Sequence, residues 1–299
     1  MVKLIALDMD GTLLTPSHEI SPRNQAAIKQ AMERGVQVIV ATGRAFYEAH
    51  GVISKIDMKL PYICLNGAEV RNESHEIVTT NALNSELIDQ AAEVFRTEDI
   101  FYQIYTDRAI YTTSIERDIE IFKDLASQMG HEADENRIRR FMEERLERGT
   151  LIETEDYKAV FDREDENVLK LLASSPSKAK LVRAKNSLYE IGNLAVSASA
   201  PHNIELTHVN AQKGIALANV AEVMGIDMKD VMAVGDNLND ISMLKRVGIS
   251  VAMGNAASEV KGIATKVTAT NTEDGVGIAI EEALEALDSK AAEIEHAED

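Results

Sequence analysis

The fold is decided by the stretch Lys3-Leu4-Ile5-Ala6-Leu7-Asp8-Met9-Asp10-Gly11-Thr12. Its apolar run is typical of a fully buried strand, and it ends in two carboxylates followed by a glycine that breaks the pattern. Asp8 and Asp10 repel each other at a strand end, so the pair needs a cation, a shared proton or a large pKa shift. A plain turn after the strand explains the same residues. This stretch alone therefore leaves a functional site and a simple turn both open.

Further strands and helices follow in alternation. Residues 21–34 have a Ser cap, a Pro at the first helical position and apolar residues at helical spacing. Strand-like runs cover residues 36–41 and 62–65, and they are broken at Thr42-Gly43-Arg44 and at Asn66-Gly67. This alternation predicts a parallel sheet, in which ligands bind beyond the carboxyl ends of the strands.

The middle of the chain differs from both ends. Residues 83–193 contain amphipathic helical stretches and a dense charge cluster, which we interpret as solvated faces. The alternating pattern returns with a helix near residues 213–224 and strand-like runs at residues 231–234 and 249–252. We therefore expect a discontinuous α/β core of residues 1–82 and 194–299, interrupted by an α+β domain.

Composition limits the classes of partner. Acidic residues outnumber basic ones by 50 to 31, and the formal charge of −19 disfavours nucleic acids and anionic membranes. An anionic substrate then needs a metal, a lysine or helix N-termini to reverse the field locally. The single cysteine, Cys64, excludes an internal disulfide and a cysteine zinc site. We expect a cytoplasmic protein, since the chain shows neither a secretory signal nor an apolar stretch of about 20 residues.

A second strand end repeats the chemistry of the first. The buried run at residues 231–234 leads into Gly235-Asp236-Asn237-Leu238-Asn239-Asp240. Neighbouring strands lie about 4.8 Å apart, so the two groups of acids are expected to converge on one hard cation, and Mg²⁺ fits best. His202 and His208 are interpreted as ordinary histidines, because their spacing fits no helical metal pair.

Four ordered motifs resemble those of the haloacid dehalogenase superfamily. They are Asp8-Met9-Asp10-Gly11-Thr12, Ala41-Thr42-Gly43-Arg44, Lys213-Gly214 and Gly235-Asp236-Asn237-Leu238-Asn239-Asp240. Asn66-Gly67-Ala68 and the large insert resemble the Cof-type branch of that superfamily. The resemblance implies a Rossmann-like parallel sheet with helices on both faces. It also implies that residues 83–193 form a mobile α+β cap that selects the substrate.

The resemblance also implies roles for the acidic residues. Asp8 is expected to be the nucleophile that takes a phosphoryl group, and Asp10 the general acid and base whose backbone carbonyl also binds magnesium. Asp8 and Asp236 are expected to hold Mg²⁺, with Asp240 as a ligand through water or as an orienting group. Asn239 is expected to contact the phosphate or to position Asp240.

Neutral donors and one cation complete the implied site. Thr42 and the amide of Gly43 are expected to bind phosphoryl oxygens, and Lys213 supplies the positive charge that an acidic site otherwise lacks. Thr42 as a helix cap and Lys213 as a surface lysine are the simple alternatives. Arg44 and Asn66 are expected either to contact the substrate or to hold their loop together.

The predicted function is Mg²⁺-dependent hydrolysis of small phosphomonoesters through an aspartyl-phosphate, in a monomer or homodimer. Sugar phosphates are the leading substrate class, carried over from the Cof-type branch, which also includes enzymes for flavin mononucleotide and pyridoxal phosphate. A phosphomutase of related fold and a non-catalytic phosphometabolite sensor are the alternatives. Nucleotide kinase, serine hydrolase and zinc protease functions lack their motifs in this sequence.

Overall fold

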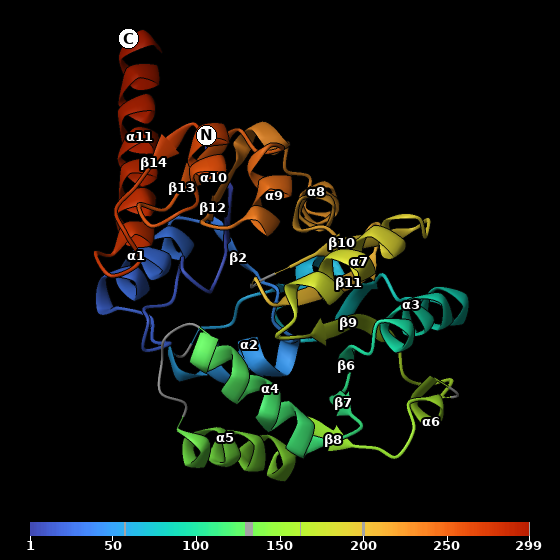
Figure 1. Cartoon of the computed structure of the whole chain (residues 1–299). Helices are drawn as coiled ribbons and strands as arrows, with labels where there is room; N and C mark the ends of the chain where they lie inside the picture. Colours follow the sequence, from blue (N-terminus) through green and yellow to red (C-terminus); the bar gives the residue numbers. More distant parts are fainter. Residues whose placement is uncertain (57, 129–133, 162, 199–200, 299) are drawn as a thin grey trace. The chain divides into compact units, whose positions relative to one another are not determined.

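The computed structural model describes residues 1–299 except 57, 129–133, 162, 199–200 and 299 (Figure 1). The chain forms two compact units. The core unit comprises Met1–Thr79 and Gln212–Asp299, and the insert unit comprises Thr80–Ala211. The predicted fold class, an α/β core interrupted by an α+β insert, is confirmed.

The core unit is built on one sheet with the strand order β14-β13-β12-β1-β2-β3-β4-β5. Pairing is parallel from β14 to β3, and β4 is antiparallel to β3. All four residues of β1 are fully buried, because a strand covered on both faces must be apolar throughout. The strands are β1 (Leu4–Leu7), β2 (Gln37–Ala41), β3 (Tyr62–Cys64), β4 (Glu69–Arg71), β5 (Ile77–Thr80), β12 (Val231–Gly235), β13 (Ile249–Ala252) and β14 (Lys266–Val267).

The local sequence explains where the first helix of the core unit begins. Ser21 accepts a hydrogen bond from the Asn24 amide and caps α1, which starts with Pro22. α1 packs against α11, and α8 packs against α9. The core helices are α1 (Pro22–Glu33), α2 (Phe46–Ile53), α8 (Lys213–Val223), α9 (Ile241–Leu244), α10 (Ser258–Ile263) and α11 (Gly275–Glu298), with 3₁₀ turns η1 (Ser54–Ile56), η2 (Leu65–Gly67), η3 (Met228–Asp230) and η4 (Leu238–Asp240).

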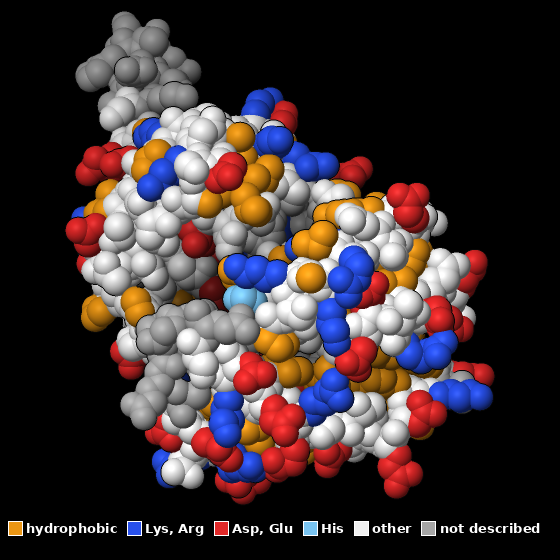
Figure 2. All heavy atoms as spheres, viewed as in Figure 1, with side chains coloured by type: hydrophobic (Ala, Val, Ile, Leu, Met, Phe, Trp, Pro, Cys, Tyr) orange, Lys and Arg blue, Asp and Glu red, His pale blue; other side chains and the backbone are white. Residues whose placement is uncertain are grey.

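Charged side chains of both signs cover the surface. Figure 2 shows acidic and basic groups intermixed over the face that it draws. Some of them are ion-paired, as Arg34, the residue after α1, is with Asp288 of α11 at 2.9 Å. Among the residues that the structure describes, no helix combines the length and the apolar character that a membrane crossing needs.

The insert unit has a sheet of its own, with the order β10-β11-β9-β6-β7-β8. Alternate residues of its central strands, including Ile104, Leu171 and Ile204, pack with α3 and α7 in one apolar cluster. The strands are β6 (Phe101–Thr106), β7 (Ile110–Thr112), β8 (Leu151–Glu153), β9 (Val168–Ser174), β10 (Leu194–Ser197) and β11 (Asn203–His208). The helices are α3 (Ser85–Thr97), α4 (Ile115–Gln128), α5 (Glu135–Glu147), α6 (Lys158–Phe161) and α7 (Lys178–Tyr189).

The insert unit extends beyond the range 83–193 expected from the sequence. β10 and β11 pair with each other and β11 pairs antiparallel with β9, so the chain leaves this sheet only after His208. The second unit therefore runs from Thr80 to Ala211. A short antiparallel hairpin close to the returning core looks the same in sequence as core strands, which explains the difference.

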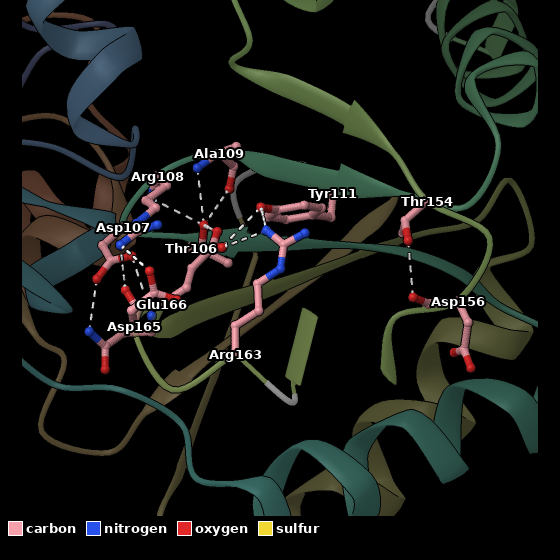
Figure 3. A network of polar contacts seen from close by, with 11 residues as sticks. Thr106, Asp107, Arg108, Ala109, Tyr111, Thr154, Asp156, Arg163, Asp165 and Glu166 are labelled. Atoms are coloured by element: carbon pink, nitrogen blue, oxygen red, sulfur yellow. Dashed lines mark hydrogen bonds and ion pairs between the residues drawn. The ribbon is translucent and has the colours of Figure 1, made fainter. Parts of the chain in front are cut away.

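A buried carboxylate ties the β6–β7 hairpin to the segment before β9 (Figure 3). Glu166 accepts hydrogen bonds from the hydroxyls of Thr106 at 2.6 Å and Tyr111 at 3.0 Å, and from Arg163 at 2.9 Å. Burial, together with the neighbouring Glu166 carboxylate, raises the pKa of Tyr111 to about 12. These contacts fix the loops of the insert unit without any residue of the predicted site.

Candidate active site

Apart from Lys213, which begins α8, the predicted site residues lie at or just after the carboxyl ends of four neighbouring strands in the core unit. Asp8 follows β1, Asp236 follows β12, Thr42 follows β2, and η2 with Asn66 follows β3. These strands are adjacent in the order β12-β1-β2-β3. The parallel pairing brings together segments far apart in the sequence, as the alternating pattern predicted.

Three carboxylates and one lysine lie at the centre of the group of residues at these strand ends. Asp8, Asp236 and Asp240 each offer an oxygen, and these atoms lie within 4.8 Å of one another. Lys213, the first residue of α8, is fully buried, and its Nζ lies 2.6 Å from Asp8 Oδ1 and 2.6 Å from Asp240 Oδ1. The alternative that Lys213 is a surface lysine is thereby excluded. We call Asp8, Lys213, Asp236 and Asp240 the acidic centre.

The acidic centre carries more negative than positive charge. Burial, with the nearby Asp240 carboxylate, raises the pKa of Asp8 well above its ordinary value. The same two causes raise the pKa of Asp236 to about 6. Burial alone would lower the pKa of Lys213, but the Asp240 and Asp8 carboxylates raise it, so the lysine is charged. Three carboxylates around one ammonium match a divalent cation in charge and in ligand type.

Both oxygens of Asp240 are occupied by donors of the protein. Oδ1 accepts from Lys213, and Oδ2 accepts from the backbone amides of Asp236 at 2.9 Å and Asn237 at 3.0 Å. The Asp240 side chain is fully buried. It therefore fixes both the lysine and the loop that carries Asp236.

Two glycines allow the close approach that the acidic centre needs. Gly11 has a φ of +77°, and a Cβ there would lie 2.3 Å from Asp236 Oδ2. Gly214 follows Lys213 in α8, and a Cβ there would lie 1.9 Å from the Ser242 carbonyl oxygen. Any side chain at either position would push the carboxylate or the lysine away.

Asp10 lies outside the acidic centre and is paired with Arg44. Its two oxygens accept from Arg44 Nε at 2.7 Å and Nη2 at 2.5 Å, and the Asp10 side chain is 51% exposed. Arg44 Nη2 also lies 3.1 Å from His18 Nδ1. Sequence reasoning named Asp10 and Arg44 separately and did not predict that they pair.

Thr42, Gly43, Asn66 and Asn239 meet beside the acidic centre. The Thr42 hydroxyl accepts from the Arg44 amide at 3.1 Å, which leaves its own proton available to donate. Asn239 Nδ2 donates to Asn66 Oδ1 at 3.0 Å, and Asn66 has a φ of 60°. A Cβ on Gly43 would lie 3.2 Å from Asn66 Oδ1. Asn66 and Asn239 therefore link the loops after β3 and β12.

Two residues at the site were not predicted. The Thr12 hydroxyl donates to Asp236 Oδ1 at 3.0 Å and orients that carboxylate. Thr12 is the last residue of the opening motif. Its hydroxyl follows Asp8 and Asp10 closely in the sequence, and this spacing could have indicated a residue that orients a carboxylate. No sequence pattern marked His18. It lies in a loop with its own φ at 58°, and this loop conformation brings its ring to Arg44.

Comparison with known proteins identifies the family. A model of the haloacid dehalogenase-like hydrolase family matches residues 5–280. The chain belongs to this family. Phosphatase YwpJ of Bacillus subtilis is 32% identical over 92% of this chain and 97% of its own length. The 5-amino-6-(5-phospho-D-ribitylamino)uracil phosphatase YwtE of the same organism is 31% identical over 95% and 98%.

Solved structures of this family share the whole fold. A haloacid dehalogenase-like hydrolase from B. subtilis superposes with a TM-score of 0.81, at 31% identity, over 94% of this chain and 99% of that chain. The predicted superfamily and its Cof-type branch are therefore confirmed, and so is the prediction that the chain is an enzyme of that superfamily.

Proposed function

We propose that this enzyme is a Mg²⁺-dependent phosphatase that hydrolyses small phosphomonoesters through an aspartyl-phosphate on Asp8. The observation that carries the proposal is the acidic centre, in which a buried aspartate after β1 shares a buried lysine with Asp240 beside Asp236. Membership of the hydrolase family and two relatives named phosphatases support the same activity.

Asp8 acts as the nucleophile. Lys213 holds Asp8 Oδ1, so the other oxygen attacks phosphorus and the bond from phosphorus to the leaving oxygen breaks. Asp240 acts through Lys213, because its second oxygen is held by two backbone amides and keeps the lysine in place. This arrangement favours Asp240 as a positioning residue over a direct metal ligand.

The donor set fits Mg²⁺. Asp8, Asp236 and the Asp10 carbonyl would hold the ion, and all three offer the oxygen ligands that magnesium prefers. When bound, Mg²⁺ supplies positive charge to the transferring phosphoryl group. Thr12 keeps the Asp236 carboxylate oriented toward that position through its hydrogen bond.

Asp10 moves the protons. It gives its proton to the leaving oxygen in the first step, and in the second it takes one from the water that attacks phosphorus and releases phosphate from Asp8. Asp10 pairs with Arg44 in this structure, so we propose that Arg44 exchanges Asp10 for a substrate phosphoryl oxygen. Thr42, the Gly43 amide, Asn66 and Asn239 complete the phosphate site.

The substrate is a small phosphorylated metabolite, with sugar phosphates as the leading class. The name of the relative YwtE gives it a substrate with a ribityl phosphate, which is a phosphate ester on a polyol chain. Its similarity over nearly the whole of both chains supports a polyol or sugar phosphate here. We place the enzyme in the cytoplasm, where such metabolites occur.

Turnover of p-nitrophenyl phosphate with Mg²⁺ tests the proposal. We expect release of free phosphate by the wild type and at least a hundredfold loss in Asp8→Asn. Asp288→Asn changes an exposed carboxylate of the same unit and should keep full activity. Undiminished turnover by Asp8→Asn would rule out the mechanism. Transfer of phosphate to a second substrate hydroxyl without its release would indicate a phosphomutase, and the absence of turnover a sensor.

A further inference from the structure

The loop that follows β13 contacts both of the strand ends that carry the proposed metal ligands. The side chain of Asn255 in this loop donates from Nδ2 to the Gly11 carbonyl oxygen at 2.7 Å. Two residues further along, the Ala257 amide donates to the Asp236 carbonyl oxygen at 3.0 Å. Residues 253–257 therefore connect the segment after β1 with the segment after β12.

The Asn255 amide is itself held in one orientation. Its Oδ1 accepts from the backbone amide of Asn271 at 2.9 Å, so its Nδ2 is the end of the side chain that faces Gly11. The Asn271 side chain donates in turn to the Leu14 carbonyl oxygen at 2.7 Å. Together the two asparagines hold the segment after β1 at Gly11 and at Leu14.

The segment held in this way carries two groups of the proposed magnesium site. Gly11 lies between Asp10, whose carbonyl is a proposed ligand, and Thr12, whose hydroxyl donates to Asp236 Oδ1 at 3.0 Å. Because a peptide group is planar, a fixed Gly11 carbonyl also fixes the plane that leads to Thr12. A glycine has more backbone freedom than any other residue, so its φ of +77° has to be selected by contacts from outside the segment. Asn255 makes such a contact.

The chemical type of the donor suits this place. A lysine or arginine could also donate to the Gly11 carbonyl, but it would add a positive charge beside the proposed Mg²⁺ site and repel the ion. The neutral amide of Asn255 holds the carbonyl and leaves the charge of the acidic centre unchanged.

We propose that Asn255 is a positioning residue of the magnesium site. Through the Gly11 carbonyl it holds the Asp10 carbonyl and the Thr12 hydroxyl in the places that metal binding requires. This inference rests on the proposed function, because it takes Mg²⁺ to be held by Asp8, Asp236 and the Asp10 carbonyl. It goes beyond that function by giving a role to a loop that supplies no metal ligand.

Calorimetric titration of the full-length protein with Mg²⁺, without substrate, tests this role. We expect Asn255→Ala to bind Mg²⁺ about tenfold more weakly than the wild type, as expected for the loss of a group that orients metal ligands. Ser258→Ala is the matched control in the same part of the chain. Ser258 is exposed, and its hydroxyl donates to Glu259 at 3.1 Å, so this variant should bind Mg²⁺ as the wild type does.

Two further measurements separate positioning from a general loss of structure. In EDTA, hydrogen exchange at the amides of residues 12–14 should be faster in Asn255→Ala, because the segment loses its hydrogen bond at Gly11. With p-nitrophenyl phosphate, the Mg²⁺ concentration for half-maximal turnover should rise about tenfold, and saturating Mg²⁺ should restore turnover to within about twofold of the wild type.

The possible results distinguish this role from the proposed function. Equal Mg²⁺ affinity of the wild type and Asn255→Ala, or unchanged hydrogen exchange, would overturn the role of Asn255 and leave the phosphatase mechanism standing. A loss of turnover that excess Mg²⁺ does not restore would overturn it as well, since it would indicate a general structural defect. Absence of Mg²⁺ binding by the wild type would overturn the proposed cofactor and this role with it.

Discussion

Lys213 is the residue on which the electrostatics of the site depend most. Its ammonium is fully buried and lies 2.6 Å from each of two carboxylates. In Lys213→Met the three carboxylates of the acidic centre lose their only buried cation among the described contacts. We expect turnover to fall by about 10²–10³-fold and the free energy of unfolding to fall by about 3 kcal/mol.

Urea denaturation and p-nitrophenyl phosphate turnover measure the two effects of Lys213→Met. Lys229→Met is the matched control, because Lys229 Nζ pairs with Asp227 on the surface and its side chain is 74% exposed. That pair should contribute little to stability. A Lys213→Met variant as stable and as active as the control would show that the buried ion pairs are dispensable.

We expect the affinity for the proposed Mg²⁺ to depend on pH through Asp236. Its pKa is raised from 3.8 to about 6, so protons compete with the metal below pH 6. We expect the Mg²⁺ affinity to rise about tenfold from pH 5 to pH 7, as the ionised fraction of Asp236 rises. Calorimetric titration with Mg²⁺ at the two pH values measures this change. An affinity that is constant, or higher at pH 5, would contradict the prediction.

The raised pKa of Asp236 also determines how the stability of the metal-free protein changes with pH. A raised pKa in the folded state means that the folded protein binds the proton more tightly than the unfolded chain. Stability from this group is fully present below pH 3.8 and is lost as the pH rises through about 6. Urea denaturation in EDTA should therefore show a decrease over that range, which Asp236→Asn should make smaller; the raised pKa of Asp8 contributes in the same direction.

Sequence reasoning named most of the residues that the structure brings together at these strand ends, because motif and strand end coincide. Asp8, Thr42 and Asp236 each follow a buried strand, and parallel pairing brings such ends together. The pairing of Asp10 with Arg44 and the contact of His18 were beyond it, since both depend on loop conformation. Three-dimensional packing decides which partner a side chain contacts. A local sequence pattern does not contain this information.

At the scale of elements, α8 delivers Lys213 only because its second residue has no side chain. Gly214→Ala would gain about 1 kcal/mol of helix propensity. The new Cβ would lie 1.9 Å from the Ser242 carbonyl oxygen, which is backbone and cannot turn aside. We expect the steric clash to outweigh the gain in helix propensity. The free energy of unfolding should fall by about 1–3 kcal/mol, and turnover should be reduced.

Gly51→Ala provides the matched comparison for α8. Gly51 lies in α2, is exposed, and has no atom within 4 Å of the position of its Cβ. Here propensity acts alone, so we expect a gain of about 0.5–1 kcal/mol. Urea denaturation of both variants should give changes of opposite sign. Equal stabilisation of both would mean that α8 and α9 separate without cost.

The elements of the core unit were more predictable than those of the insert unit. Predicted runs at residues 36–41 and 231–234 correspond to β2 and β12, because strands of a covered parallel sheet are apolar throughout. The insert sheet is antiparallel in part, and its strand β9 carries the charged Lys170. Such strands give weaker signals than covered parallel strands. Residues 194–208, which contain β10 and β11, fell inside the range expected for the core.

At the scale of the whole molecule, the negative charge is distributed over the chain, whereas the proposed chemistry is confined to one edge of the core sheet. The net charge of −19 is spread over a surface of mixed charges, whereas Lys213 and Arg44 supply positive charge at the strand ends. Composition alone therefore predicts poor binding of anions, while the ordered motifs predict a phosphate site. The two predictions are compatible if the proposed Mg²⁺, together with Lys213, reverses the field at one edge of the core sheet.

Trapping the phosphoenzyme tests the central claim most directly. The Asp10→Ala variant lacks the base that activates water, so an aspartyl-phosphate formed from p-nitrophenyl phosphate should accumulate. Rapid acid quenching, followed by mass spectrometry of the peptides, locates the phosphoryl group. The account predicts Mg²⁺-dependent phosphorylation of Asp8, and none in Asp8→Asn. A phosphoryl group on any other residue, or turnover by the wild type that continues without Asp8, would contradict it.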